Sequence, residues 1–297
     1  MKFKIIHQLN LCIMNYKVKT LALLLAVAAG NSARAQQATY AQGCKSYTFI
    51  GTPAAGSGDI TYQWYRNGQP IPNANGKDYT LPLKEAYGEN VEFKRGVMSS
   101  GCPGEVAFST PFYLTFSGLK IDTLCWAHTN VDAPNTFATK PDMYTSFYQW
   151  NRLTAWAGTG TVSGWNSTPD TSATWTVNPC PAGWRLPDTA EFRALFNVRF
   201  TWNAAQTRGN EVGGRFFGPN YATCSLPSNM VGCIFLPVAG VRDDTGKLLQ
   251  QSGIGYYWSS LQGGKNFGLT YNFYYVQAIF DTTGYHKEYG LSIRCVQ

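Results

Sequence analysis

Charged residues and histidines are scarce in this chain, and both scarcities exclude functions. Charged side chains make up 14% of the sequence, and only three residues are histidines. Two of these, His128 and His286, lie far apart, and neither has a cysteine or carboxylate at metal-ligand spacing. The motifs Gly-x-Ser-x-Gly and His-Glu-x-x-His are missing, as is a phosphate-binding glycine loop. We therefore expect no catalytic residue, no metal and no cofactor.

The apolar run near the N-terminus is too short to span a membrane. It covers residues 21–29, which is well under the length of a permanent transmembrane helix. Lys17 and Lys19 precede it, and a small-x-small cleavage site that ends at Ala35 follows it. Residues 1–35 are therefore predicted to be a signal peptide. The protein is expected to be exported to the cell surface, the periplasm or the medium, with no integral membrane span.

A strong positive charge is also absent once this leader is removed. Residues 1–35 hold five of the 24 lysines and arginines and none of the 17 acids. Removing them leaves 19 bases against 17 acids, so the net charge falls from +7 to +2. A nearly neutral chain has no electrostatic footprint for nucleic acid, so we expect no nucleic-acid partner.

Aromatic residues, glycine and proline are what the chain has in quantity. Aromatic residues make up 15% of it, beside 30 glycines and 15 prolines. This composition is typical of many short strands joined by turns rather than of long amphipathic helices. The length permits two domains. The sequence thus predicts a β-rich, two-domain extracellular protein.

The first predicted domain covers residues 38–117 and contains a hairpin signal and a tryptophan between two cysteines. Residues 60–66 alternate like a half-buried strand, and the Asn67-Gly68 pair that follows is a strong hairpin signal. Trp64 lies between two cysteines, in the order that places an indole against an inter-sheet disulfide. These features together resemble a bacterial immunoglobulin-like domain. The resemblance implies an Ig-like β-sandwich that serves as a spacer or docking module.

Three blocks define the second predicted domain, residues 119–297. They are Cys-Pro-Ala-Gly-Trp-Arg-Leu-Pro at 180–187, Gly-Tyr-Tyr-Trp-Ser-Ser at 255–260 and Leu-Ser-Ile-Arg-Cys-Val at 291–296. Together they resemble the Fibrobacter succinogenes major paralogous domain, a secreted bacterial module related to C-type lectins and formylglycine-generating enzymes. The resemblance implies an α+β C-type-lectin-like fold that displays a binding surface. It also implies that the tryptophans of the first two blocks, Trp184 and Trp258, belong to the core.

Site motifs of the related proteins are not reproduced in this chain. Formylglycine-generating enzymes bind copper with a closely spaced cysteine pair near the C-terminus, and no such pair stands at the matching place here. Calcium-dependent lectins carry Glu-Pro-Asn or Gln-Pro-Asp and then Trp-Asn-Asp. This chain has Ala133-Pro134-Asn135 and Trp165-Asn166-Ser167, neither with the acid, and Asp243-Asp244 is predicted to be a turn. The resemblance therefore extends to the fold and not to these sites.

The cysteines of an exported protein are candidates for disulfides, because that compartment is oxidising. Seven of the eight remain after residue 35, so one thiol is left over. Spacing alone does not fix the connectivity, but the domain division favours one pair in the first domain and two in the second: Cys44 with Cys102, Cys180 with Cys295, and Cys224 with Cys233. Cys125, in an apolar segment, is then predicted to be a buried free thiol.

The best helix prediction in the second domain begins after Asp188. Glu191 stands three residues later, as in a capping box, and Phe192, Leu195 and Phe196 recur at helical spacing. A second, weaker helix is predicted over residues 147–156. Short strands are predicted over residues 233–238, 256–259, 269–280 and 290–296.

Residues 266–289 are crowded with aromatic and amide side chains and resemble the terminal variable region of lectin-fold proteins that retroelements diversify. Aromatic rings bury area at low entropy cost, and amides adapt their hydrogen bonds. Because alternate strand residues face opposite sides, one alternate set must be core, and the other is expected to be displayed. The predicted ligand-binding residues are Asn266, Tyr271, Asn272, Phe273, Tyr274, Tyr275, Tyr285 and His286.

Three functions remain open at this point. The preferred one is a secreted or surface-attached, adhesin-like protein that binds an extracellular protein or glycan. The alternative is an exported enzyme, or enzyme accessory, of the formylglycine-generating type. The third is a purely structural envelope protein.

We predict that the exported protein begins at Gln36, because the leader has a charged, an apolar and a cleavage region in order. Mass spectrometry of the N-terminal peptide of the exported protein should find Gln-Gln-Ala-Thr-Tyr at its start. Recovery of residues 14–35 on that protein would contradict the prediction.

Overall fold

The computed structural model describes residues 4–5, 39–41, 44, 47–54, 58–81, 91–101, 103–204, 212–225, 227, 230, 232–275 and 278–297. The chain divides into two compact units, Met1–Ala41 with Lys45–Thr115 and Gln42–Cys44 with Phe116–Gln297. Strands predominate, and the one helix among the described residues is α2 (Thr189–Asn197), which confirms the β-rich class. In the same residues no helix has the length and apolarity needed to cross a bilayer.

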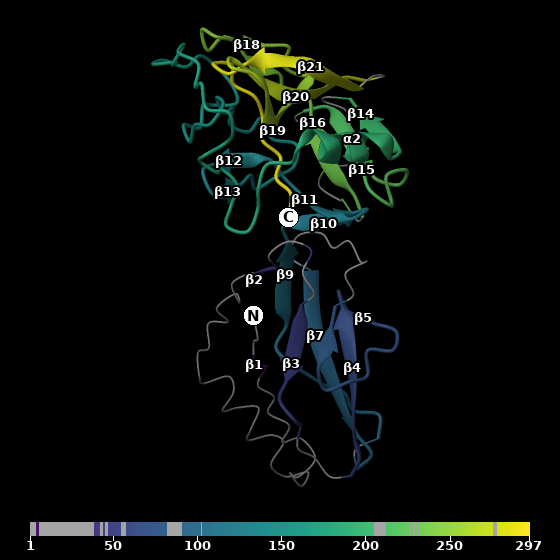
Figure 1. Cartoon of the computed structure of the whole chain (residues 1–297). Helices are drawn as coiled ribbons and strands as arrows, with labels where there is room; N and C mark the ends of the chain where they lie inside the picture. The colour runs from purple at the N-terminus through teal and green to yellow at the C-terminus, as the bar shows by residue number, and fades with distance from the viewer. Residues whose placement is uncertain are drawn as a thin grey trace. The chain divides into compact units, whose positions relative to one another are not determined.

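Short strands form two sheets in the first unit (Figure 1). The strands are β1 (Lys4–Ile5), β2 (Thr39–Ala41), β3 (Thr48–Gly51), β4 (Ile60–Arg66), β5 (Gln69–Pro70), β6 (Tyr79–Thr80), β7 (Val91–Ser99), β8 (Ala107–Phe108) and β9 (Phe112–Phe116). One sheet has the order β1-β3-β6, and the other has the order β2-β9-β7-β4-β5 with β8 paired to β7. Apart from β1, the predicted signal peptide lies outside the described residues.

The strand and hairpin predicted in the first unit are confirmed. β4 covers residues 60–66 and pairs antiparallel with β5 through Arg66 and Gln69. Asn67 and Gly68 form the two-residue turn, with φ values of 47° and 79°. Positive φ at both positions is the requirement of a type I′ turn, which Asn-Gly satisfies at little steric cost.

An aromatic cluster forms the core of the first unit. Trp64 of β4 is fully buried, and its ring centroid lies 5.2 Å from that of Phe49 in the other sheet. Phe93 of β7 lies 4.9 Å from Phe49, and the Trp64 indole N–H donates to the Gly76 carbonyl at 3.0 Å. Phe49 therefore joins the two sheets by packing against aromatic residues of two strands.

The described residues of the second unit form five small sheets and α2. Its strands are β10 (Gly118–Ile121), β11 (Leu124–Ala127), β12 (Val131–Ala133), β13 (Thr136–Phe137), β14 (Phe200–Asn203), β15 (Gly214–Phe217), β16 (Ile234–Pro237), β17 (Val241–Arg242), β18 (Leu248–Leu249), β19 (Gly255–Gly264), β20 (Phe267–Phe273) and β21 (Ala278–His286). The described sheets are β10-β11, β12-β13, β14-β15-β16, β17-β18 and β19-β20-β21.

Helix α2 joins the two three-stranded sheets of this unit (Figure 1). It begins at the predicted capping box, in which the Asp188 carboxylate accepts from the Glu191 N–H and the Glu191 carboxylate accepts from the Asp188 N–H, both at 2.8 Å. Phe196 then lies 4.8 Å from Phe217 of β15 and 4.2 Å from Tyr271 of β20, measured between ring centroids. The capping box thus starts α2 at a position from which the aromatic face of the helix lies between the two sheets.

The predicted helix over residues 147–156 is wrong. Phe147 and Trp156 instead form an antiparallel bridge, with Asn151 at φ 54° in the turn between them. The Asn151 side chain accepts from the N–H groups of Thr176 and Val177, at 2.6 and 3.1 Å. The aromatic spacing that suggested a helix reflects side chains that enter the core from a loop.

Two of the four strand predictions in the second unit are confirmed: residues 233–238 contain β16, and residues 256–259 belong to β19. The other two need correction. The single strand predicted over 269–280 is two strands, β20 and β21, which pair antiparallel. The strand predicted over 290–296 forms isolated bridges, such as Tyr148 with Leu291 and Arg185 with Val296. The C-terminal segment therefore makes single bridges to β11, to β19 and to neighbouring loops, such as Trp126 with Val296 and Tyr257 with Ser292, instead of forming a strand of a sheet.

Two of the three predicted disulfides are confirmed, and one is wrong. Cys180 bonds to Cys295, and Cys224 bonds to Cys233. Cys44 bonds to Cys125, so Cys125 is not a free thiol and Cys44 is not paired with Cys102, which lies outside the described residues. The error came from the domain division, because Cys44 belongs with the second unit although the chain around it enters the first.

We predict that the Cys44–Cys125 bond stabilises the second unit. The bond closes a loop with a sequence separation of 81 residues, so replacing both cysteines by alanine should lower the free energy of unfolding by roughly 3 to 5 kcal/mol in the chain-entropy treatment. Chemical denaturation measures the loss, and peptide mapping without reduction should recover Cys44 joined to Cys125. A Cys44–Cys102 peptide would contradict the assignment.

Candidate functional site

The predicted ligand-binding residues on β20 are mostly buried. β20 is the central strand of its sheet, and Tyr271 packs against α2, with ring centroids 4.2 Å from Phe196 and 5.6 Å from Phe192. Phe273 is fully buried on the same face and lies 5.2 Å from Phe196. These aromatic rings form the contact between the sheet and the helix and are not displayed.

The opposite face of β20 is covered as well. Asn272 is buried, and its cross-strand partner Tyr256 and the neighbouring Trp258 are buried with it. Trp150, from the irregular segment before α2, packs 5.6 Å from Trp258. The expectation that one alternate set of this strand is exposed is therefore wrong for residues 271–273, because a helix covers one face and a loop covers the other. The expected burial of Trp258, and of Trp184, is confirmed.

The remaining predicted residues lie at two separate ends of the sheet. Asn266, Tyr285 and His286 lie at the end where β20 begins, and Tyr274 and Tyr275 follow the end of β20. The seven residues of β20 separate the two groups, which corresponds to roughly 23 Å at about 3.3 Å per residue. The structure therefore divides the predicted surface into two.

Tyr275 carries the exposed aromatic surface at the end of β20. Its side chain is 60% exposed, and its ring centroid lies 5.5 Å from that of Trp202 in β14, at an interplanar angle of 71°. Arg215 of β15 fixes the preceding residue, because its guanidinium donates to the Tyr274 carbonyl at 2.6 Å and lies 3.9 Å from the Phe200 ring centroid. Burial lowers the pKa of Arg215 to about 10. An edge-to-face aromatic pair is thus held at the surface by a buried cation.

The end where β20 begins is more polar. The His286 ring packs 4.5 Å from Phe267, and its Nδ1 atom lies 3.5 Å from a Glu288 carboxylate oxygen. Asn266 and His286 are exposed, and Leu261 of β19 is 44% exposed. Tyr289 adds an aromatic ring whose centroid lies 5.8 Å from that of His286 and 5.9 Å from that of Tyr285, so this end is a mixed polar and aromatic surface.

A buried polar cluster lies inside the second unit. Arg294 is fully buried and donates to the carbonyls of Ala127 and Phe235, both at 2.6 Å. Burial raises the pKa of the neighbouring Tyr257 to about 12, and its hydroxyl donates to the Pro237 carbonyl at 2.9 Å. Burial, and then the charge of Arg294, lowers the pKa of His128 to about 4. This cluster joins core segments and has no access to a ligand.

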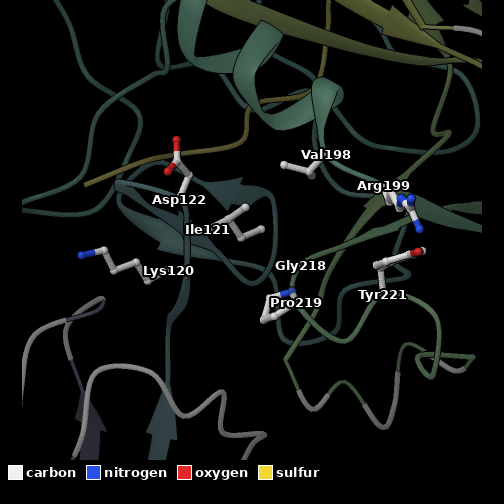
Figure 2. A pocket seen from close by; sticks show the side chains of 8 residues that line it. All are labelled: Lys120, Ile121, Asp122, Val198, Arg199, Gly218, Pro219 and Tyr221. Carbon is white, nitrogen blue, oxygen red and sulfur yellow. The ribbon is translucent and has the colours of Figure 1, made fainter.

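A surface pocket of about 390 Å³ lies elsewhere on the second unit. Figure 2 shows apolar side chains in its middle and charged or hydroxyl-bearing side chains toward its two sides. Three separate segments line it: the tip of the β10–β11 hairpin, the residues after α2 and the loop after β15. The lining residues are Lys120, Ile121, Asp122, Val198, Arg199, Gly218, Pro219 and Tyr221.

Within the described part of the chain, no group of three or more His, Cys, Asp or Glu side chains is placed to hold a metal ion. Asp243 acts in the predicted turn between β17 and β18, where its carboxylate accepts from the N–H groups of Thr245 and Lys247, both at 2.9 Å. Every described cysteine is in a disulfide.

Comparisons of the chain with protein-family models, with curated proteins and with solved structures find no match. The two resemblances inferred from sequence blocks stay predictions.

Sequence reasoning missed Trp202 and the whole pocket. The alternation of Phe200 and Trp202 after the helix was an available signal for an aromatic strand. The pocket gave no such signal, because its polar residues are single side chains in three segments that are far apart in the sequence. Only the packing of the hairpin beside the loop after β15 brings them together.

The lowered pKa of His128 predicts an acid-sensitive fold. Between pH 6.5 and about 4, His128 is protonated in the unfolded chain and neutral in the folded protein. The free energy of unfolding therefore falls as the pH falls through this window. Between pH 7.5 and 5 the loss should be roughly 2 kcal/mol. Urea denaturation of the wild type and of His128→Gln measures it: the variant should lose less stability over this range. If the wild type and His128→Gln lose the same stability between pH 7.5 and 5, His128 is not the group responsible.

Proposed function

We propose that this protein is an exported binding protein of the adhesin type, in which the second unit contacts an extracellular protein or glycan. The proposal retains the two resemblances drawn from the sequence, an Ig-like first domain and a C-type-lectin-like second domain. The β-rich architecture and the three disulfides among the described residues support it, since disulfides persist in oxidising compartments. Under this proposal the first unit is a spacer, and the second unit carries the contact surface.

The pair formed by the exposed Tyr275 and the half-buried Trp202 is the observation that carries the proposal. Large aromatic side chains are usually buried, and here Tyr275 is 60% exposed while most of the neighbouring aromatic residues on β20 are core. Tyr and Trp are the residues that anchor binding surfaces, because a rigid ring buries much area and loses little conformational entropy. The buried Arg215 fixes the backbone before Tyr275, so the ring is presented in a defined place.

Only part of the predicted binding set belongs to this surface. Tyr275 is its centre and Tyr274 is its neighbour, whereas Tyr271, Asn272 and Phe273 are scaffold because they are buried. Asn266, Tyr285 and His286 lie at the other end of β20, so one compact ligand does not contact both groups. Whether this region is diversified is a separate matter of gene sequence and does not affect the physical proposal.

The enzyme alternative rests on the formylglycine-generating resemblance alone. A copper site of that kind needs two closely spaced thiolates. Cys224 and Cys233, the closest pair among the described cysteines, form a disulfide. Copper analysis and thiol titration of the purified protein therefore test the alternative directly, since bound copper with two free thiols would favour it.

We predict that Tyr275→Ala weakens ligand binding and leaves folding nearly unchanged. Immobilised glycans and extracellular proteins should first be screened with the exported chain, and the affinity for the strongest hit should then be measured. Loss of an aromatic anchor of about 1.4 kcal/mol or more corresponds to at least roughly a tenfold rise in Kd. The melting temperature should stay nearly constant, because the side chain is largely exposed.

Two control variants make this test specific. Leu261→Ala removes an exposed apolar side chain from β19 and should leave affinity unchanged. Tyr271→Ala removes a ring from the contact with α2 and should lower the melting temperature. Unchanged affinity in both Tyr275→Ala and Trp202→Ala would overturn the proposed surface.

A further inference from the structure

The pocket on the second unit is preformed by three restrained segments. The β10–β11 hairpin supplies Lys120, Ile121 and Asp122, and its register is fixed by pairing from Gly118 with Ala127 to Ile121 with Leu124. The end of α2 supplies Val198, whose N–H donates to the Leu195 carbonyl at 3.3 Å. These contacts fix two sides of the pocket before any ligand is present.

The loop after β15 forms the third side. The Tyr221 N–H donates to the Gly218 carbonyl at 3.2 Å, and the Asn220 N–H donates to the Gly232 carbonyl at 3.2 Å. Gly218 has a φ of 134°, and a Cβ atom there would lie 2.4 Å from the Gly232 carbonyl oxygen. Only glycine therefore fits this close approach, and the Cys224–Cys233 bond closes the same loop.

The lining places different chemistry at different parts of the pocket. Figure 2 shows Ile121 and Val198 in the middle, Arg199 and Tyr221 toward one side, and Lys120 and Asp122 toward the other. The middle is apolar. The first side combines a guanidinium with a phenol hydroxyl, and the second combines one cation with one carboxylate.

The polar groups of the pocket are not used to hold the fold. In the described part of the chain, the side chains of Lys120, Asp122, Arg199 and Tyr221 have neither a hydrogen bond nor an ion pair. A guanidinium suits a carboxylate because its parallel N–H groups donate to both oxygens, and a phenol O–H can add a further donor. On the other side, Lys120 and Asp122 carry opposite charges, so a neutral polar group of the ligand is favoured there over a charged one.

From this arrangement we infer that the pocket binds a small carboxylic acid with an apolar body. The carboxylate contacts Arg199 and Tyr221, and the apolar body lies over Ile121, Val198 and Pro219. A pocket volume of about 390 Å³ falls in the range that accommodates small organic ligands. A phosphate dianion fits less well, because the apolar middle of the pocket offers it no donors. This site is independent of the Trp202–Tyr275 surface.

Titration of the full exported chain with 3-phenylpropionate tests the inference, with 3-phenylpropionamide as the uncharged analogue. Isothermal calorimetry should find saturable binding of the acid and weaker binding of the amide. Arg199→Gln should raise the Kd for the acid about tenfold, in line with the loss of a charge-assisted hydrogen bond. Tyr221→Phe should raise it by a smaller factor, since one neutral donor is lost.

Matched controls separate this site from general electrostatics and from the other surface. Arg193→Gln removes an exposed guanidinium from α2, outside the pocket lining, and should leave the Kd unchanged. Tyr275→Ala should also leave it unchanged, so failure of either proposal is visible without the other. Absence of saturable binding, equal affinity for acid and amide, or equal effects of Arg199→Gln and Arg193→Gln would each overturn the inference.

Discussion

Buried side chains that donate to backbone carbonyls are the interaction on which the second unit depends. The chain between β13 and α2 runs through some fifty residues with isolated bridges in place of sheets, so few of its carbonyls have strand partners. Arg242 donates to the carbonyls of Ala157 and Gly160, at 2.7 and 2.9 Å. Gln149 donates to those of Asn166 and Glu288, at 2.6 and 2.7 Å. Each contact supplies a buried donor with a backbone acceptor, and a buried donor left without an acceptor would be costly.

The fixed position of this irregular segment explains which side chains of the second unit remain exposed for binding. The irregular segment, once fixed, carries Trp150 onto the Trp258 face of the sheet, while α2 covers the other face. The broad faces of β20 are therefore used for stability. Exposed side chains with freedom to contact a partner remain at strand ends and on loops, where Tyr275 and the pocket are found.

The two surfaces differ in chemistry and suit different ligands. The Trp202–Tyr275 pair offers an exposed tyrosine ring packed on a half-buried tryptophan, which under the proposed function contacts a large partner. The pocket offers a few converging polar groups around an apolar middle, which orients a small molecule. Both are held by elements of the β14-β15-β16 region, since β14 carries Trp202 and the loop after β15 carries Tyr221. Under the two proposals, this scaffold combines an adhesive contact with recognition of a small ligand.

Local signals in the sequence determined several elements of the fold. The capping box of Asp188 and Glu191 defined the start of α2, and Asn67-Gly68 defined a hairpin turn, because both depend on neighbouring residues alone. The β-rich class followed from the amino-acid composition, which likewise requires no knowledge of tertiary contacts. The aromatic spacing over 147–156 gave the wrong element, since a loop that enters a core can carry the same spacing as a helix.

Tertiary structure alone decided which side chains are displayed and which cysteines meet. The alternation along β20 is a local property, but the number of faces that are covered depends on α2 and on Trp150, which come from distant parts of the chain. Cys44 pairs with Cys125 because its short segment packs with the second unit, a fact that spacing does not contain. The pocket residues converge for the same reason: contacts between distant segments are set by the packing of whole elements, whereas a sequence pattern reports only its own neighbourhood.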